Sequence, residues 1–130
     1  MGYMTDGLTF NTLRGGNKAR LPEFKNCHGE AAHSKADGSD WSPAQWLQAM
    51  VGELGEYANA RKKFERGDYS QEEFMAKARM ELSDVVIYLD ILAAQLGIDL
   101  GEAVMQTFNT KSVQVGSRVR LAADDWHYAD

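Results

Sequence analysis

The stretch "VGELGEYANA", residues 51–60, decides the interpretation of the chain, because its two acids lie among the apolar residues of an amphipathic helix. At 100° per residue, Glu53 and Glu56 share the helix face that carries Tyr57 and Ala60. An ordinary solvated acidic face would lie opposite the apolar stripe. The pattern therefore predicts two carboxylates that point toward the interior of the protein.

The stretch "MELSDVVIYL", residues 80–89, repeats this pattern with Glu81 and Asp84 on a second apolar stripe. A short connection near Asp68 separates the two stretches, so we expect their helices to pack antiparallel. Both acid pairs are equally far along the chain from this turn. The hairpin is therefore expected to bring four carboxylates to the same height, facing one another.

Four carboxylates in an interior are unfavourable unless they are compensated, because each loses hydration and like charges repel. A hard divalent cation would compensate them, and oxygen-only ligands are typical of Mg²⁺, with Mn²⁺ as a substitute. The alternative is a solvated acidic helix surface, which is what this spacing usually means. The mirrored positions favour the metal site.

The sequence contains several signals for the starts and ends of helices. Capping patterns occur at "SPAQ" (42–45), "SQEE" (70–73) and "DLGE" (99–102), and Gly67 and Gly97 supply C-terminal stops. These signals predict an all-α protein in which an antiparallel hairpin is part of a four-helix bundle-like fold. The expected helices cover residues of about 8–25, 43–66, 71–96 and 100–110.

Length and composition indicate one domain, 1–130, with a core at 42–111, a less ordered loop at 26–41 and a less ordered tail at 112–130. The net charge of −5 argues against nucleic acid or an anionic membrane as a partner. A single cysteine, Cys27, fits a reducing compartment. With no signal peptide or membrane-spanning run, we expect a cytoplasmic protein.

Other metal chemistries fit the sequence less well. A di-iron bundle would need Glu-x-x-His pairs on helices, whereas His28, His33 and His127 lie outside the strong helical segments. The stretch "CHGEAAH", residues 27–33, has no matching second half for a zinc site. Phosphohydrolases that use adjacent His and Asp ligands are excluded, since no His-Asp pair occurs.

The segments "GELGEYANARKKFERGDYS" and "MELSDVVIYLDILAAQLGIDLGEAVMQTFNTK", between Gly52 and Lys111, resemble the core of the MazG-like family of all-α nucleoside triphosphate pyrophosphohydrolases. The resemblance implies Mg²⁺-dependent hydrolysis between the α- and β-phosphates, which releases a nucleoside monophosphate and pyrophosphate. Many members have a doubled acid where this chain has Gly52 before Glu53, while others read G-E-x-x-E. The acids on the family's metal-binding positions are Glu53, Glu56, Glu81 and Asp84.

The opening "LTFNTLRGGNKAR", residues 8–20, is similar to the F-x-x-L-R-x-x-N-x-x-R start of phage and bacterial MazG-like proteins. Some of these, the MazZ group, are associated with purine deoxynucleotides. The resemblance thus implies a preference for dGTP or dATP and, for a phage-encoded protein, a location in the host cytoplasm. Asn109 and Lys111 resemble the N-x-K motif that closes the family's active site.

The expected chemistry also follows from the residue types. Glu53 or Glu56 could accept the proton of the attacking water, and the sequence does not distinguish them. Trp46 and Tyr88 lie on the acid-bearing stripes, where they stack on the base or simply pack in the core. Basic residues near the acids bind phosphates or remain solvated. The candidate substrate-binding residues are Asn17, Arg20, Trp46, Lys77, Tyr88, Asn109 and Lys111.

The segment 84–96 is apolar almost all round, more than one hairpin with two short helices can cover. We therefore expect a homodimer or a homotetramer. A competing function is a non-catalytic all-α module for oligomerisation or partner binding. That alternative accounts for the helices but not for the mirrored acids.

Overall fold

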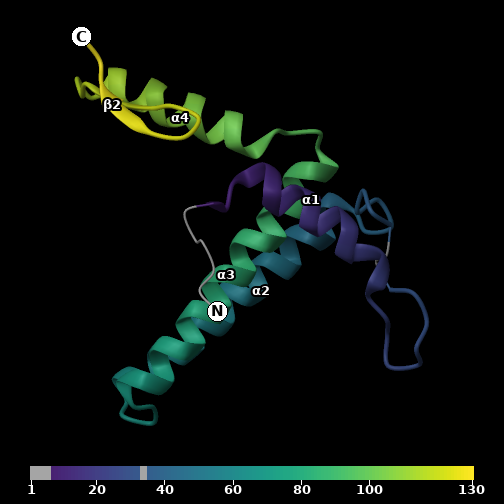
Figure 1. Cartoon of the computed structure of the whole chain (residues 1–130). Helices are drawn as coiled ribbons and strands as arrows, with labels where there is room; N and C mark the ends of the chain where they lie inside the picture. Colours follow the sequence, from purple (N-terminus) through teal and green to yellow (C-terminus); the bar gives the residue numbers. More distant parts are fainter. Residues whose placement is uncertain (1–6, 33–34) are drawn as a thin grey trace.

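The computed structural model describes residues 7–32 and 35–130. Within these ranges it consists of four α-helices, one short 3-10 helix and a two-stranded antiparallel sheet (Figure 1). The prediction of an all-α protein is confirmed. The elements are α1 (Phe10–Arg20), η2 (Leu21–Glu23), α2 (Pro43–Glu65), α3 (Gln71–Gln95), α4 (Leu100–Gln114), β1 (Val119–Leu121) and β2 (Trp126–Tyr128).

Both helices of the central hairpin start at the predicted capping boxes. The hydroxyl of Ser42 accepts from the backbone N–H of Gln45, whose side chain accepts in return from the Ser42 N–H. Ser70 and Glu73 form the same reciprocal pair at the start of α3. Between the helices the chain reverses at Gly67, whose φ of 91° is rarely adopted by other residues. Local sequence therefore sets the bounds of the hairpin.

The hairpin is held together near its turn by small and aromatic residues. Ala60 and Ala78 are buried together with Phe74, and the ring of Phe64 stacks on Phe74 at 4.6 Å. Alanines let the two helices approach closely while the rings fill the space at the turn. The contact between α2 and α3 is the most extensive in the fold.

A second buried cluster, formed by Leu21, Trp46 and Ile91, closes the opposite end of the hairpin. Trp46 has no solvent-exposed surface, and its indole N–H donates to the carbonyl of Gly38 at 2.8 Å. Gly38 has a φ of 73°, and an added Cβ would lie 3.2 Å from the indole nitrogen. Part of the loop 26–41, expected to be less ordered, is therefore packed on this core.

Helix α1 is anchored to α3 by a buried charge pair. Arg14 Nε donates to both carboxylate oxygens of Asp90, at 3.1 and 3.2 Å, and its Nη2 donates to the carbonyl of Ile98 at 2.8 Å. Asn17 Nδ2 donates to Asp90 Oδ2 at 2.9 Å. Asp90 is fully buried, so these donors replace its hydration.

The first and last predicted segments differ from the structure. The helix expected at 8–25 ends at Arg20 and continues as the 3-10 turn η2, because Pro22 has no N–H for an α-helical bond. Helix α4 continues past residue 110 to Gln114, and the tail expected to be less ordered forms the hairpin β1–β2. That the whole chain is one domain stays a prediction.

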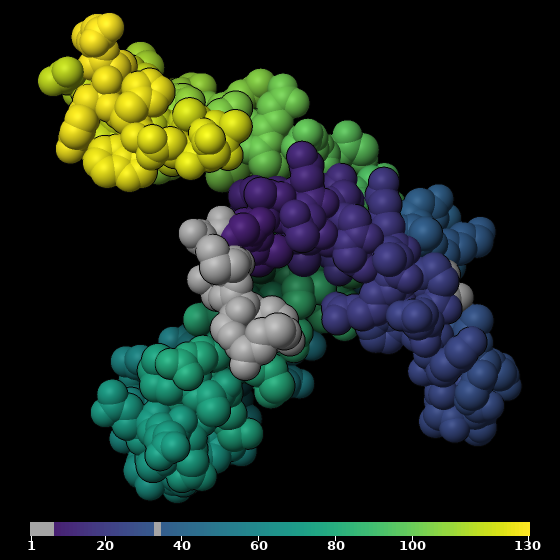
Figure 2. Space-filling view, in the orientation of Figure 1, coloured from purple at the N-terminus to yellow at the C-terminus, as the bar shows by residue number. Residues whose placement is uncertain are grey.

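Helix α4 leaves the hairpin rather than lying along it (Figures 1 and 2). In the part of the chain that the structure describes, α4 contacts α1, α3 and β1 but makes no contact with α2. Large apolar side chains therefore stay exposed on several helices; they include Leu47, Val51, Leu54, Leu82, Val86, Val104 and Phe108. None of the described helices combines the length and the apolarity needed to cross a bilayer.

We predict that Asp90→Ala lowers the free energy of unfolding by about 2–4 kcal/mol. The substitution leaves the Arg14 guanidinium and the Asn17 amide without their acceptor, and the 20% exposure of Arg14 moderates the cost. Urea unfolding at one protein concentration measures the change. The control is Asp68→Ala, which breaks an exposed pair with Arg66 and should cost less than about 1 kcal/mol. Equal losses in the two variants would contradict the anchoring role of Asp90.

Candidate metal centre and its adjoining pocket

Three of the four predicted acids converge between α2 and α3. Glu53 from α2, with Glu81 and Asp84 from α3, offers carboxylate oxygens that all lie within 4.8 Å of one another. Glu81 is buried, whereas Glu53 and Asp84 are half-buried. The antiparallel hairpin thus brings these acids together as the mirrored spacing predicted. We call these three residues the acid group.

Glu56 lies at the edge of the acid group. It is exposed and is not one of the three residues whose oxygens converge. Its side chain still lowers the pKa of the Glu81 carboxyl through a hydrogen bond. The reason is its place on α2, about 60° around the helix from Glu53 and toward solvent.

The Glu81 carboxyl lacks ordinary compensation. Its Oε2 is buried and has no hydrogen-bond partner among the described residues. The pKa of Glu81 is raised, chiefly by a hydrogen bond shared with the Glu53 carboxyl, then by burial and by the negative charges of Glu53 and Asp84; a hydrogen bond with Glu56 opposes this rise. No ion pair with a basic side chain relieves the acid group within the described residues.

An orphaned, buried carboxylate oxygen is costly, and here it faces two further carboxylates. A divalent cation that prefers oxygen ligands would satisfy all three. The donor set therefore fits such an ion. Within residues 7–32 and 35–130 no other group of three or more metal-ligating side chains is found. Cys27 and His28 are exposed and outside any such group, and His33 lies outside the described residues.

A pocket of about 260 Å³ adjoins the acid group, and Asp84 lines it. Four residues predicted to bind substrate lie around it, contributed by α1, α2 and α3. Apart from Asp84, the other lining residues are apolar, and one of them, Leu21, belongs to η2. The nine lining residues are Asn17, Arg20, Leu21, Phe24, Trp46, Asp84, Ile87, Tyr88 and Ile91.

The aromatic residues of the pocket differ in what they can contact. Trp46 is fully buried, so it supports the wall, and of its two alternatives core packing is the one that the structure shows. Tyr88 is half-buried, and the centroid of its ring lies 6.1 Å from the centroid of the Trp46 ring. The pKa of Tyr88 is raised by burial first and then by Glu53 and Asp84, with Arg20 opposing. Phe24 is a lining residue that was not among the candidates, although it follows Asn17 and Arg20 along one predicted helix face.

The other predicted substrate-binding residues lie elsewhere. Lys77 is one turn before Glu81 on α3, with its ammonium 5.3 Å from the ring of Tyr69. Both polar atoms of the Asn109 amide bind the backbone of Leu121 on β1, at 2.7 and 3.0 Å. Lys111 is exposed on α4, which makes no contact with α2 in the described ranges. Within one chain, Asn109 and Lys111 are therefore not brought to the acid group.

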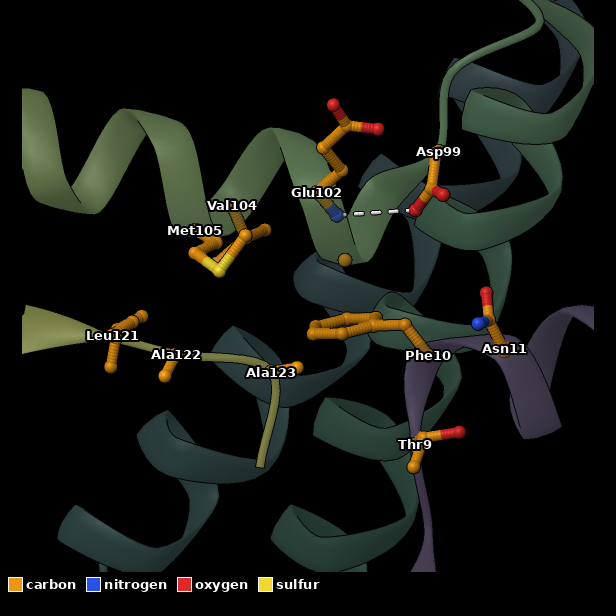
Figure 3. Close-up of a pocket in the computed structure, with 11 residues that line it drawn as sticks. Thr9, Phe10, Asn11, Asp99, Glu102, Val104, Met105, Leu121, Ala122 and Ala123 are labelled. Atoms are coloured by element: carbon orange, nitrogen blue, oxygen red, sulfur yellow. Dashed lines mark hydrogen bonds between the residues drawn. The ribbon is translucent and has the colours of Figure 1, made fainter. Parts of the chain in front are cut away.

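Another hollow, of about 290 Å³, lies between the start of α1, helix α4 and strand β1 (Figure 3). The ring of Phe10 occupies its centre, facing the apolar side chains of Met105 and Leu121. Asp99 is engaged as the cap of α4, accepting from the N–H of Glu102 at 3.1 Å, and the Glu102 carboxylate points away from Phe10. The acids among the residues drawn therefore do not converge on this hollow.

We predict that Glu81→Gln removes a pH dependence of stability in the metal-free protein. A carboxyl whose pKa is higher in the folded than in the unfolded state destabilises the fold once it ionises. The loss begins as pH rises through the unfolded value, near 4.5, and ends above the raised pKa. Urea unfolding in EDTA measures the free energy of unfolding at each pH. Over this pH window it should fall less steeply with pH for Glu81→Gln than for wild type. At neutral pH the variant should be at least as stable as wild type. The control is Glu56→Gln. If Glu81→Gln were less stable than wild type and its free energy of unfolding depended on pH as steeply, a raised pKa at Glu81 would be contradicted.

No family model matches the chain. Among curated proteins it is similar to dCTP pyrophosphatase 1 of Rattus norvegicus, with 36% identity over 98 residues that cover 69% of this chain and 55% of the relative. It is 31% identical to dCTP pyrophosphatase 1 of Mus musculus over 113 residues, 81% of this chain and 64% of the relative. For dCTP pyrophosphatase 1 of Homo sapiens the identity is 34% over 93 residues, 65% of this chain and 52% of the relative. The chain thus spans between about half and two thirds of the length of these curated relatives, and they are its homologues.

Proposed function

We propose that the chain is a MazG-like nucleoside triphosphate pyrophosphohydrolase that depends on Mg²⁺, with Mn²⁺ as a substitute. It would release a (deoxy)nucleoside monophosphate and pyrophosphate. The observation that carries the proposal is that Asp84 belongs both to the acid group and to the adjoining pocket. The similarity to proteins named dCTP pyrophosphatase supports the same class of reaction.

In this proposal the pocket would hold the base of the nucleotide, and the acid group would lie beside the triphosphate. At about 260 Å³, the pocket is below the roughly 300–1,000 Å³ typical of sites for whole small ligands. A nucleobase would enter it between Phe24 and Tyr88, and the triphosphate would extend toward Asp84. Arg20, exposed at the pocket rim, is a phosphate-binding candidate.

The acids have separate tasks in this proposal. Glu53, Glu81 and Asp84 would hold the divalent cation, with Glu56 beside them. Such an ion supplies charge neutralisation on the phosphates and Lewis-acid activation of the attacking water. Glu53 or Glu56 would accept the proton of that water, and the exposure of Glu56 gives it a route to solvent. Tyr88, whose pKa is raised above an already high value, keeps its hydroxyl proton and acts as a donor.

The base preference rests on two different resemblances. The start of the chain resembles phage proteins associated with purine deoxynucleotides, which favours dGTP or dATP. The curated relatives are named for dCTP, a pyrimidine nucleotide. We keep the purine preference as the proposal, and the substrate assay below decides between the two.

Residues from a second copy would complete the site. Asn109 and Lys111 lie on α4, which extends away from α2, so their predicted role needs the α4 of another copy. The exposed apolar side chains of α2, α3 and α4 provide surfaces for such an assembly. We therefore propose a homodimer or a homotetramer.

We predict that incubation with each (d)NTP and Mg²⁺ yields the monophosphate and pyrophosphate, and that Asp84→Asn abolishes turnover. The substitution removes a charged oxygen ligand that also borders the substrate pocket. Both products are quantified by ion-exchange chromatography. Orthophosphate with a diphosphate product would contradict the reaction class, whereas preference for a pyrimidine would contradict only the purine proposal.

A thermal melt separates loss of metal from loss of fold. Mg²⁺ at roughly one hundred times its dissociation constant should stabilise wild type by about 2.7 kcal/mol at neutral pH, and less at acid pH, where protons compete for the ligands. Asp84→Asn should respond less to Mg²⁺ yet be as stable as wild type in EDTA. A non-catalytic module would instead retain partner binding after all four acids become amides.

We predict an assembly larger than the monomer mass of 14.5 kDa. Light scattering at micromolar concentration measures it, and Val86→Lys on the exposed face of α3 should shift the protein toward monomer by burying an unpaired charge at the interface. Mixing inactive Asp84→Asn with inactive Lys111→Ala should restore activity if sites are shared. A compact, fully active wild-type monomer would contradict the assembly.

A further inference from the structure

The side chain of Asn17 is an unusual feature of the pocket wall, because it is polar, 5% exposed and only partly used. Its Nδ2 donates to Asp90 Oδ2 at 2.9 Å and, at a longer 3.4 Å, to the carbonyl of Ile87. Its Oδ1 accepts no hydrogen bond from any described residue. In the described part of the chain the fully buried side-chain atoms without a partner are Glu81 Oε2 and Gln95 Oε1, so Asn17 Oδ1 is still accessible to water or to a ligand.

The orientation of this amide is determined by its neighbours. A carboxylate paired with Arg14 and a backbone carbonyl both only accept hydrogen bonds, so the NH₂ of Asn17 must face them. The opposite orientation would place Oδ1 against two other acceptors. Oδ1 is therefore held on the far side of the amide from Asp90, and Asn17 is one of the residues that line the pocket.

The other polar groups of the pocket have different uses. The Trp46 indole N–H donates to Gly38, and the Asp84 carboxylate belongs to the acid group. Arg20 offers only donors, whereas the Tyr88 hydroxyl can both donate and accept. Unlike the rotatable Tyr88 hydroxyl, Asn17 Oδ1 is an acceptor that its neighbours hold in one orientation, and it lies outside the acid group.

We propose that Asn17 Oδ1 selects nucleotides whose base carries an amino group at the position of cytosine N4 or adenine N6, by accepting a hydrogen bond from that group. Cytosine and adenine have this donor, whereas uracil, thymine, hypoxanthine and guanine present a carbonyl oxygen at the equivalent position. An oxo group in its place would put two desolvated acceptors face to face. The inference rests on the proposed function in that the pocket holds the base. It is independent of ring size, so it does not depend on the purine preference.

The test uses binding rather than turnover. The probes are dCMP against dUMP, and dAMP against dIMP, titrated calorimetrically into wild type with Mg²⁺. Within the ring size that binds, an amino-bearing nucleotide should bind roughly 10-fold more tightly than its counterpart, the effect expected for leaving a buried acceptor unpaired. Asn17→Leu should bring that ratio close to one. Asn11→Leu, on an exposed position of the same helix, should retain it.

A second variant tests the orientation. Asp90→Asn can accept or donate, so it allows the Asn17 amide to turn over, and the ratio should fall although Asn17 is retained. Equal binding of amino and oxo bases by wild type, or no binding of any probe, would overturn the inference whether or not the variants fold. Intact selectivity without hydrolysis of any triphosphate would instead refute the proposed reaction and leave the role of Asn17 standing.

Discussion

Repulsion among carboxylates held inside a helical hairpin is the constraint on which the rest of this structure depends. Glu81 is buried against Glu53 and Asp84 with one oxygen unpartnered, so the hairpin carries an unfavourable charge arrangement at its middle. Packing on both sides offsets this cost. The aromatic cluster around Phe74 holds the turn end, and the cluster around Trp46 holds the other. An oxygen-seeking cation would convert the unfavourable arrangement into a ligand set.

The two buried acids of α3 show how environment separates a structural from a functional carboxylate. Asp90 is fully buried but receives donors from Arg14 and Asn17, so its negative charge is matched and joins α1 to α3. Glu81 faces only other acids, and the pKa of its carboxyl is raised. The same side-chain chemistry thus stabilises the fold at one position and leaves an uncompensated carboxyl, which a cation would suit, at the other. Because α1 forms one wall of the pocket, the Asp90 anchor also shapes that pocket.

Three features of the chain could not be predicted from local pattern, because each depends on a contact between distant segments. Trp46 is an equal candidate for base stacking and for core packing in the sequence, and only the approach of Gly38 and Ile91 shows that it is covered. The N-x-K context places Asn109 at the substrate site, whereas in one chain its amide binds the Leu121 backbone. The tail, residues 112–130, shows no clear helical or strand periodicity in its sequence, so low order is predicted for it. Its hairpin lies against α4, a contact that no local pattern encodes.

The sequence by itself determined the two helices of the hairpin with their starts and stops, their antiparallel pairing and the height at which Glu53, Glu81 and Asp84 meet. These features depend on interactions within a few residues, such as capping boxes and helical periodicity, or on one short connection. Only the tertiary structure decided that Glu56 lies outside the acid group, that Arg14 pairs with Asp90, and that Asn17 is buried in the wall of a pocket. Those outcomes depend on the angle and distance between elements far apart in the chain, where side-chain packing and desolvation, not spacing, select the partner.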